Sequence, residues 1–179
     1  SDWADSFPYK YVVNFTALTK PGRYVLSTEA GARSGEFTIG SYPPYQEDLL
    51  FFMRQQRCGY NPYLDVVCHK RDGRAFYAPF PDGTFVDASG GWHDAGDQLK
   101  YLITASNATA RMILAYELEK QKFSDTVDEL GRPWPNGVPD VLDEAKWGLD
   151  WIFKLHPAAD QLFHQVADDR DHRGFKLPD

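Results

Sequence analysis

The segment Gly90–Asp97, which reads Gly-Gly-Trp-His-Asp-Ala-Gly-Asp, constrains the fold more than any other stretch of this chain. Three of its eight residues are glycine, and glycine permits positive φ and close approach of the backbone. The segment is therefore predicted to be a shaped loop and not the interior of a helix or strand. Apolar residues then recur at helical spacing, which predicts that the loop leads into a long amphipathic helix: Leu99, Leu102, Ile103, Ala110, Ile113, Leu114 and Leu118.

Two carboxylates of this loop, Asp94 and Asp97, are separated only by the small residues Ala95 and Gly96. If the loop turns there, both carboxylates can point into one cavity, where such a pair can hold and deprotonate a water molecule. An aspartate just before a helix is also a common N-cap, so Asp97 could be a cap and nothing more. The residues by themselves leave both interpretations open.

Composition limits the classes of partner. The 179 residues are 42% hydrophobic and 15% aromatic, which is ample for one ordinary domain or two small ones and argues against disorder. A net charge of −7 and an isoelectric point near 5.2 argue against nucleic acid and anionic membranes as partners, because both attract basic surfaces. No run of about 18 apolar residues is present, so the sequence predicts no membrane span.

The order of patterns along the chain predicts strands first and helices later. Short strands are expected at Tyr9–Phe15, Arg23–Thr28 and Glu36–Ile39, with a turn at Pro21-Gly22. Two prolines at 43 and 44 break the pattern, and a helical period begins at Gln46. Residues 58–91 are rich in loop signals. A further helix is expected from about Asp140 to just before Pro157.

The Gly90–Asp97 segment, followed by Lys100-Tyr101, resembles the signature around the catalytic aspartates of glycoside hydrolase family 9, the inverting endoglucanases. Asn136–Trp147 resembles the family's N-G-I-P-D-I-L-D-E segment. The resemblance implies a mainly α fold, in which residues 43–179 form the N-terminal portion of an (α/α)6 barrel. Residues 1–42 are similar to the closing strands of an immunoglobulin-like β-sandwich that precedes the catalytic domain in many members.

The resemblance implies hydrolysis of β-1,4-glycosidic bonds in cellulose or a related β-glucan with inversion. Asp97 would be the general base and Asp94 would help to hold the water. The implied sugar contacts are Trp92, Tyr101, His172 and Phe175. The family's general acid is a glutamate far downstream that has no counterpart here, so the 179 residues are expected to be an inactive fragment that functions with the remainder of the same polypeptide. The alternative is a non-catalytic carbohydrate-binding module. Such enzymes are secreted or periplasmic, although no signal peptide is present in this chain.

Two metal sites are predicted. Cys58, Cys68, His69 and His93 supply the two thiolates and two imidazoles of a tetrahedral zinc sphere, and the resemblance implies a structural zinc; a Cys58–Cys68 disulfide is the alternative. The oxygens of Asn136, Val138, Asp140 and Asp143 are suited to calcium, whereas an N-cap at Asp140 with acids in the first turn is the simpler interpretation.

Overall fold

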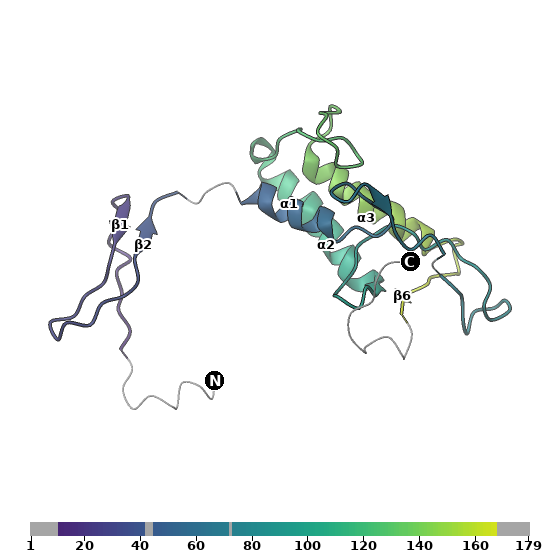
Figure 1. The fold of residues 1–179 in the computed structure, drawn as a ribbon, viewed down its shortest axis with the longest axis horizontal. Helices are drawn as coiled ribbons and strands as arrows, with labels where there is room; N and C mark the ends of the chain where they lie inside the picture. Colours follow the sequence, from purple (N-terminus) through teal and green to yellow (C-terminus); the bar gives the residue numbers. More distant parts are fainter. Residues whose placement is uncertain (1–10, 42–44, 72, 168–179) are drawn as a thin grey trace. The chain divides into compact units, whose positions relative to one another are not determined.

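The computed structural model describes residues 11–41, 45–71 and 73–167 (Figure 1). The chain divides into two compact units, Ser1–Pro43 and Pro44–Asp179. No helix of the described residues has both the length and the apolar character that crossing a membrane requires.

The smaller unit contains one antiparallel ribbon. Strand β1, Gly22–Tyr24, pairs with β2, Phe37–Ile39, in a register that places Gly22 opposite Ile39. The strand predicted at residues 9–15 is wrong for its described part, because residues 11–15 belong to no strand and the Tyr11 side chain is exposed. A ribbon of two strands offers these residues little apolar surface to cover. The immunoglobulin-like identity of this unit stays a prediction.

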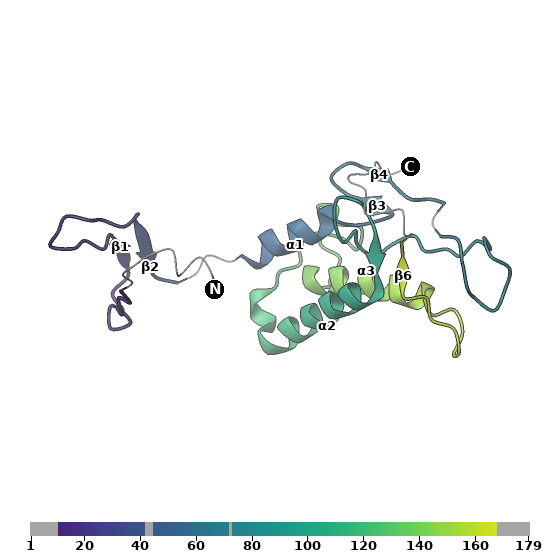
Figure 2. The same cartoon turned by 90° about the horizontal axis from the view of Figure 1, so that it is seen from below.

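The larger unit is built on α1 (Gln46–Gln55), α2 (Leu102–Leu118) and α3 (Asp140–Lys154), and a 3₁₀ turn at Lys120–Lys122 follows α2. Helix α3 packs against both α1 and α2 and lies between them (Figure 2). Its apolar residues recur on one face, where Val141 and Ala145, and Leu155 just after the helix, are buried as the spacing predicts, and the flanking Trp151 is buried as well.

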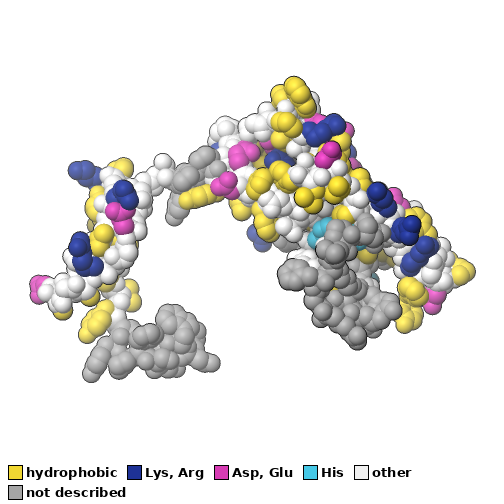
Figure 3. All heavy atoms as spheres, viewed as in Figure 1, with side chains coloured by type: hydrophobic (Ala, Val, Ile, Leu, Met, Phe, Trp, Pro, Cys, Tyr) yellow, Lys and Arg dark blue, Asp and Glu magenta, His cyan; other side chains and the backbone are white. Residues whose placement is uncertain are grey.

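Helix α2 differs from the prediction in its start and in the face that it buries. It begins at Leu102 and not directly after Asp97, and it packs on α3 through the small residues Ala105 and Thr109. Ile103 is 79% exposed, and Ile113, Leu114 and Leu118 are also exposed. The two helices approach closely through small side chains, and Leu102 and Met112 pack partly buried against the core, while the four larger apolar residues named above lie on the outer face. Hydrophobic side chains are accordingly visible on the surface of the helical unit (Figure 3).

Short strand pairs hold the segments between the helices. Strand β3 (Tyr60–Asn61) pairs with β4 (Val66–Val67), and β5 (Lys100–Tyr101) pairs with β6 (Gln165–Val166), both antiparallel. An isolated bridge between Arg57 and Trp92 joins the end of α1 to the glycine-rich loop. The loop is therefore held on both sides of its two aspartates.

Candidate functional site

The two aspartates lie in a tight turn. The Asp94 N–H donates to the Leu99 carbonyl at 2.7 Å, and the Gln98 N–H donates to the Ala95 carbonyl at 2.9 Å. Gln98 has a φ of +63°, a left-handed conformation that is uncommon outside glycine. The backbone between Asp94 and Leu99 thus closes on itself, as the small residues between the aspartates predict.

The structure separates the roles of the two carboxylates. Asp94 Oδ1 accepts a hydrogen bond from the Thr104 hydroxyl at 3.1 Å, whereas Asp97 lines a cavity of about 500 Å³. Asp94 is not among the residues lining this cavity, and the expectation that both carboxylates point into one cavity stays a prediction. Asp97 is also not the N-cap of α2, because Tyr101 occupies that position. The capping interpretation of Asp97 is excluded.

Trp92 is held in the core by a buried ion pair. Its indole N–H donates to Glu144 Oε1 at 2.8 Å, and the same carboxylate receives Arg57 through Nε at 3.2 Å and Nη2 at 2.8 Å. Trp92 is 6% exposed, and Glu144 is fully buried. The predicted sugar contact of Trp92 is thus corrected, because its ring packs in the core and fixes the chain just before His93 and Asp94.

Two glycines allow this packing. Gly91 has a φ of +68°, and a Cβ there would lie 2.6 Å from the Trp151 ring. A Cβ at Gly148 of α3 would lie 2.2 Å from the Trp92 ring and 2.4 Å from the Thr109 hydroxyl. The indole of Trp92 therefore packs directly against the backbone of helix α3.

Three segments bring the predicted metal ligands together. The Cys58 N–H donates to the Gly91 carbonyl at 2.9 Å and the His93 N–H to the Gln56 carbonyl at 2.8 Å, so the end of α1 runs beside the loop. The β3–β4 pair returns the chain, and the Cys68 N–H donates to the Gly59 carbonyl at 3.0 Å. One ligand atom from each of Cys58, Cys68, His69 and His93 lies within 4.8 Å of all the others.

The geometry of this cluster fits a tetrahedral ion. Zinc bonds of about 2.3 Å to sulfur and 2.0–2.1 Å to nitrogen at tetrahedral angles place ligand atoms about 3.3 to 3.8 Å apart. His93 Nε2 lies 3.2 Å from His69 Nδ1 and 3.9 Å from Cys68 Sγ. The two cysteines are not joined in a disulfide in this structure.

The surroundings of the two sulfurs shift the pKa values of their thiols in opposite directions. The hydrogen bond from Cys68 lowers the pKa of the Cys58 thiol, with smaller contributions from His69, His93 and the charge of Lys100. The same hydrogen bond raises the pKa of the Cys68 thiol, and burial adds to the rise. A metal ion binds the thiolate forms, so a cation bound there would displace the protons of both thiols.

Lys100 is a participant that the sequence did not reveal. Its ammonium group is fully buried and donates to Cys58 Sγ at 3.0 Å, to the Ala88 carbonyl at 2.5 Å and to the Gly90 carbonyl at 3.3 Å. It thus connects the metal-ligand cluster to the entry of the glycine-rich loop. The only sequence signal for this role is the position of Lys100 directly after the signature. Its residue type gives no indication of burial, because lysine is ordinarily a surface residue.

The predicted calcium ligands have other partners. Asp140 Oδ1 accepts the N–H groups of Thr126 and Val127 at 2.9 and 3.1 Å, and Asp143 Oδ2 accepts the Asn136 amide at 3.0 Å. Asp140 is the first residue of α3 and not its N-cap, which is Pro139. These bonds join the segment before α3 to its first turn. Calcium at Asn136, Val138, Asp140 and Asp143 stays a prediction.

Of the remaining predicted sugar contacts, Tyr101 is half-buried in β5, while His172 and Phe175 lie outside the described residues. The cavity beside Asp97 contains residues that were not predicted from the sequence. Arg71, Arg74, Phe76 and Phe163 all line it. They lie 21 or more positions from Asp97 in the chain, so only the fold brings them together.

The chain is similar to a protein family and to several known proteins. A profile of Glycosyl hydrolase family 9 matches residues 42–179. Endoglucanase D of Acetivibrio thermocellus is 30% identical over 94% of this chain and 28% of its own length. A metagenome-derived glycoside hydrolase family 9 endoglucanase of known structure has a TM-score of 0.65 and 41% identity, covering 84% of this chain and 29% of its own.

A second solved structure, a Zn-binding triple mutant of the family 9 endoglucanase J30, has a TM-score of 0.62 and 32% identity over 83% of this chain and 30% of its own. The chain thus spans less than a third of the length of these relatives. The signature, the helical core and the matched profile agree, and the chain belongs to glycosyl hydrolase family 9.

Proposed function

We propose that the full-length protein hydrolyses β-1,4-glycosidic bonds of cellulose or a related β-glucan with inversion of configuration. The observation that carries this proposal is the position of Asp97, in a closed turn and on a cavity, with no capping role in α2. Relatives named endoglucanase support the substrate class. They give no support to the alternative of a non-catalytic carbohydrate-binding module.

In the proposed mechanism Asp97 accepts a proton from a water molecule that attacks the anomeric carbon from the face opposite the leaving group. Asp94 helps to hold that water, and its hydrogen bond from Thr104 fixes its carboxylate. An inverting enzyme also needs a carboxylic acid that protonates the leaving oxygen. We assign this acid to the remainder of the polypeptide, as in the family.

Substitution of Asp97 in the full-length protein tests the proposal. Asp97→Asn should lower kcat by several orders of magnitude with little change in KM, because the base acts on water only in the transition state. Azide added to Asp97→Ala should restore turnover and give the α-glycosyl azide from a β-linked substrate. Nuclear magnetic resonance should detect the α anomer as the first wild-type product. Full activity in Asp97→Asn or a β product would contradict the assignment.

We also propose that Cys58, Cys68, His69 and His93 hold a structural zinc ion. The S₂N₂ donor set and its spacing support zinc, and a triple mutant of a related endoglucanase is described as Zn-binding. Four protein ligands leave no open position, so the ion would contribute stability and orientation of the Asp94 loop and no chemistry of its own.

The exposed apolar face of α2 is proposed to contact further helices of the same polypeptide. Ile103, Leu114 and Leu118 are each more than half exposed, which is unusual for a stripe of large apolar residues on one helix. A barrel of alternating helices would cover them.

A secreted or periplasmic location is proposed as well, because a polymeric glucan has to be met outside the cytoplasm.

A further inference from the structure

The hairpin Gly73–Val86 projects from the helical unit close to Asp97. Backbone hydrogen bonds close its base, with Gly73 and Val86 exchanging both N–H···O bonds at 3.0 and 3.1 Å and the Ala75 N–H donating to the Thr84 carbonyl at 2.9 Å. Figures 1 and 2 show the loop beyond this base reaching away from the helices. The hairpin is thus an ordered projection with a defined stem.

The tip of the hairpin exposes aromatic rings on a strained backbone. Phe76 is 60% exposed and Tyr77 is 99% exposed. Tyr77 has a φ of +58°, a conformation that bulky residues rarely adopt, and its N–H donates to Asp82 Oδ1 at 3.0 Å. A ring this exposed adds nothing to the core, and strain held at a surface position commonly marks a functional site.

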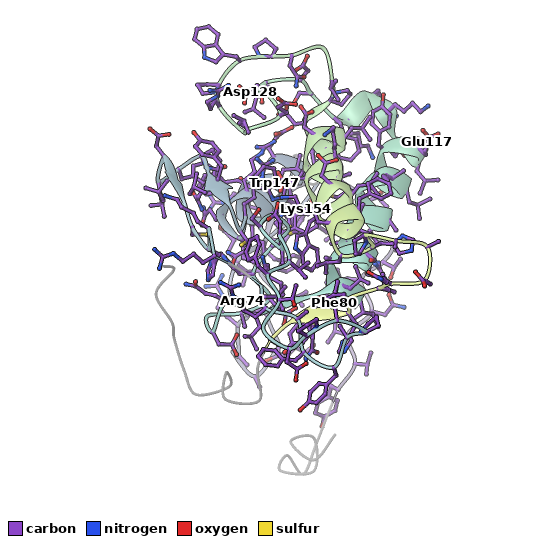
Figure 4. All side chains as sticks on the ribbon, turned by 90° about the vertical axis from the view of Figure 1, so that its right-hand side faces the viewer. Arg74, Phe80, Glu117, Asp128, Trp147 and Lys154 are labelled. Atoms are coloured by element: carbon purple, nitrogen blue, oxygen red, sulfur yellow. The ribbon has the colours of Figure 1, made fainter. Side chains whose placement is uncertain are left out.

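The hairpin is fixed with respect to Asp97. Phe80 packs edge-on against Phe163 with ring centroids 6.1 Å apart. The segment that carries Phe163 continues into β6, which pairs with β5 three residues after Asp97. In Figure 4, Arg74 and Phe80 lie in the same lower part of the unit, away from Asp128.

A groove connects the aspartate to the hairpin. The cavity of about 500 Å³ that Asp97 lines adjoins a second cavity of about 670 Å³, and the two share Arg74, Phe76 and Phe163 among their walls. Tyr77 lines the second cavity. The guanidinium of Arg74 lies over the Phe85 ring at 5.3 Å, so its planar N–H donors are held beside the groove.

We infer that Phe76 and Tyr77, together with Arg74, form a glucan-binding subsite beyond the cleavage point, in the groove that starts at Asp97; this rests on the proposed function. The apolar face of a pyranose ring packs on an aromatic ring, and guanidinium N–H groups donate to sugar hydroxyls. A continuous groove from a hydrolytic carboxylate suits a linear glycan chain. The subsite binds the glucosyl unit that only longer chains provide.

The length dependence of hydrolysis tests this subsite. In the full-length protein, kcat/KM is measured for cello-oligosaccharides from cellotriose to cellohexaose. The double variant Phe76→Ala/Tyr77→Asn should lose about tenfold in kcat/KM on cellohexaose, since each ring contact contributes roughly two- to tenfold, and little on cellotriose. Asparagine tolerates the left-handed backbone, so this change removes the ring at position 77 without adding strain.

Two matched variants test whether the loss in kcat/KM is caused by removal of the rings at positions 76 and 77 and not by any change at an exposed aromatic residue. Tyr77→Phe keeps the ring and should keep the wild-type length dependence. Trp134→Ala removes another exposed aromatic, 70% exposed, in the loop that carries Asp128 at the far end of Figure 4, and should also have no effect. Melting temperatures of all variants should match the wild type, because the removed rings are exposed.

The outcomes distinguish the subsite from the function on which it rests. Loss confined to long substrates, absent in both matched variants, supports the subsite. An equal loss of kcat/KM at every substrate length, or no loss, overturns the subsite. In that case the proposed function still stands if the wild type hydrolyses β-glucan. A wild-type protein that cleaves no β-glucan overturns both.

Discussion

The Glu144 side chain connects α3 to the end of α1 and to the glycine-rich loop. Its carboxylate joins Arg57 at the end of α1, Trp92 in the glycine-rich loop and, at 3.6 Å, Arg54. Arg57 also lies over the Trp147 ring at 4.3 Å. Such a buried pair need not be more stable than an apolar substitute, but removing one partner leaves the other charge buried without compensation.

We therefore predict that Glu144→Gln destabilises the protein strongly. Glutamine keeps an acceptor for the Trp92 indole but removes the negative charge opposite Arg57 and Arg54. The free energy of unfolding should fall by about 3 to 5 kcal/mol in denaturant titrations. Glu129→Gln is the matched control, because the Glu129 side chain is exposed and Arg57 reaches only its backbone carbonyl at 3.2 Å. Equal stability of the two variants would contradict the prediction.

At the scale of elements, the contact between α3 and the loop depends on the absence of a side chain at Gly148. The space that a Cβ would need is taken by the Trp92 ring and by the Thr109 hydroxyl of α2. One helix position therefore sets both the α2–α3 distance and the position of the loop that carries His93 and Asp94.

Gly148→Ala should destabilise the protein although alanine is the better helix former by about 1 kcal/mol. Overpacking should outweigh that gain and give a net loss of about 1 to 3 kcal/mol by thermal or denaturant unfolding, with reduced activity in the full-length protein. Asp150→Ala, at an exposed position of the same helix, should change stability by less than about 0.5 kcal/mol. A more stable Gly148→Ala would show that the contact is not as close as the structure indicates.

At the scale of the whole molecule, the metal-ligand cluster joins three segments that are remote in sequence. The end of α1, the residues after β4 and the glycine-rich loop each supply ligands to it, and backbone hydrogen bonds also connect them. His69 has a φ of +52°, so one ligand is presented from a left-handed backbone that the surrounding contacts must hold.

Metal analysis of the purified full-length protein should find about one zinc per chain in this cluster. Cys68→Ser should abolish that zinc and lower the melting temperature while leaving residual activity, because the ion orients the loop and takes no part in bond cleavage. Zinc affinity should fall as pH falls, since protons compete for the thiolates. Cobalt substitution should produce thiolate charge-transfer absorption in the wild type and lose part of it in Cys68→Ser. A Cys58–Cys68 disulfide in the purified protein would refute the site.

The sequence by itself determined the features that depend on local chemistry. Three glycines in Gly90–Asp97 indicated a shaped loop, and the helical period indicated α1, α2 and α3. The residue types at Cys58, Cys68, His69 and His93 left zinc and a disulfide both open, and the resemblance to the family favoured the four-residue cluster that the structure brings together.

Only the tertiary structure decided which faces are buried and which groups meet. Periodicity locates an apolar stripe on α2, but the small residues Ala105 and Thr109 face α3 because Gly148 allows close approach. The pairing of β5 with β6 delays the start of α2 to Leu102, and this removes Asp97 from the capping position. Trp92, Lys100 and Glu144 were placed in the interior by partners remote in sequence, because burial of a polar or charged group depends on hydrogen bonds that no local pattern records.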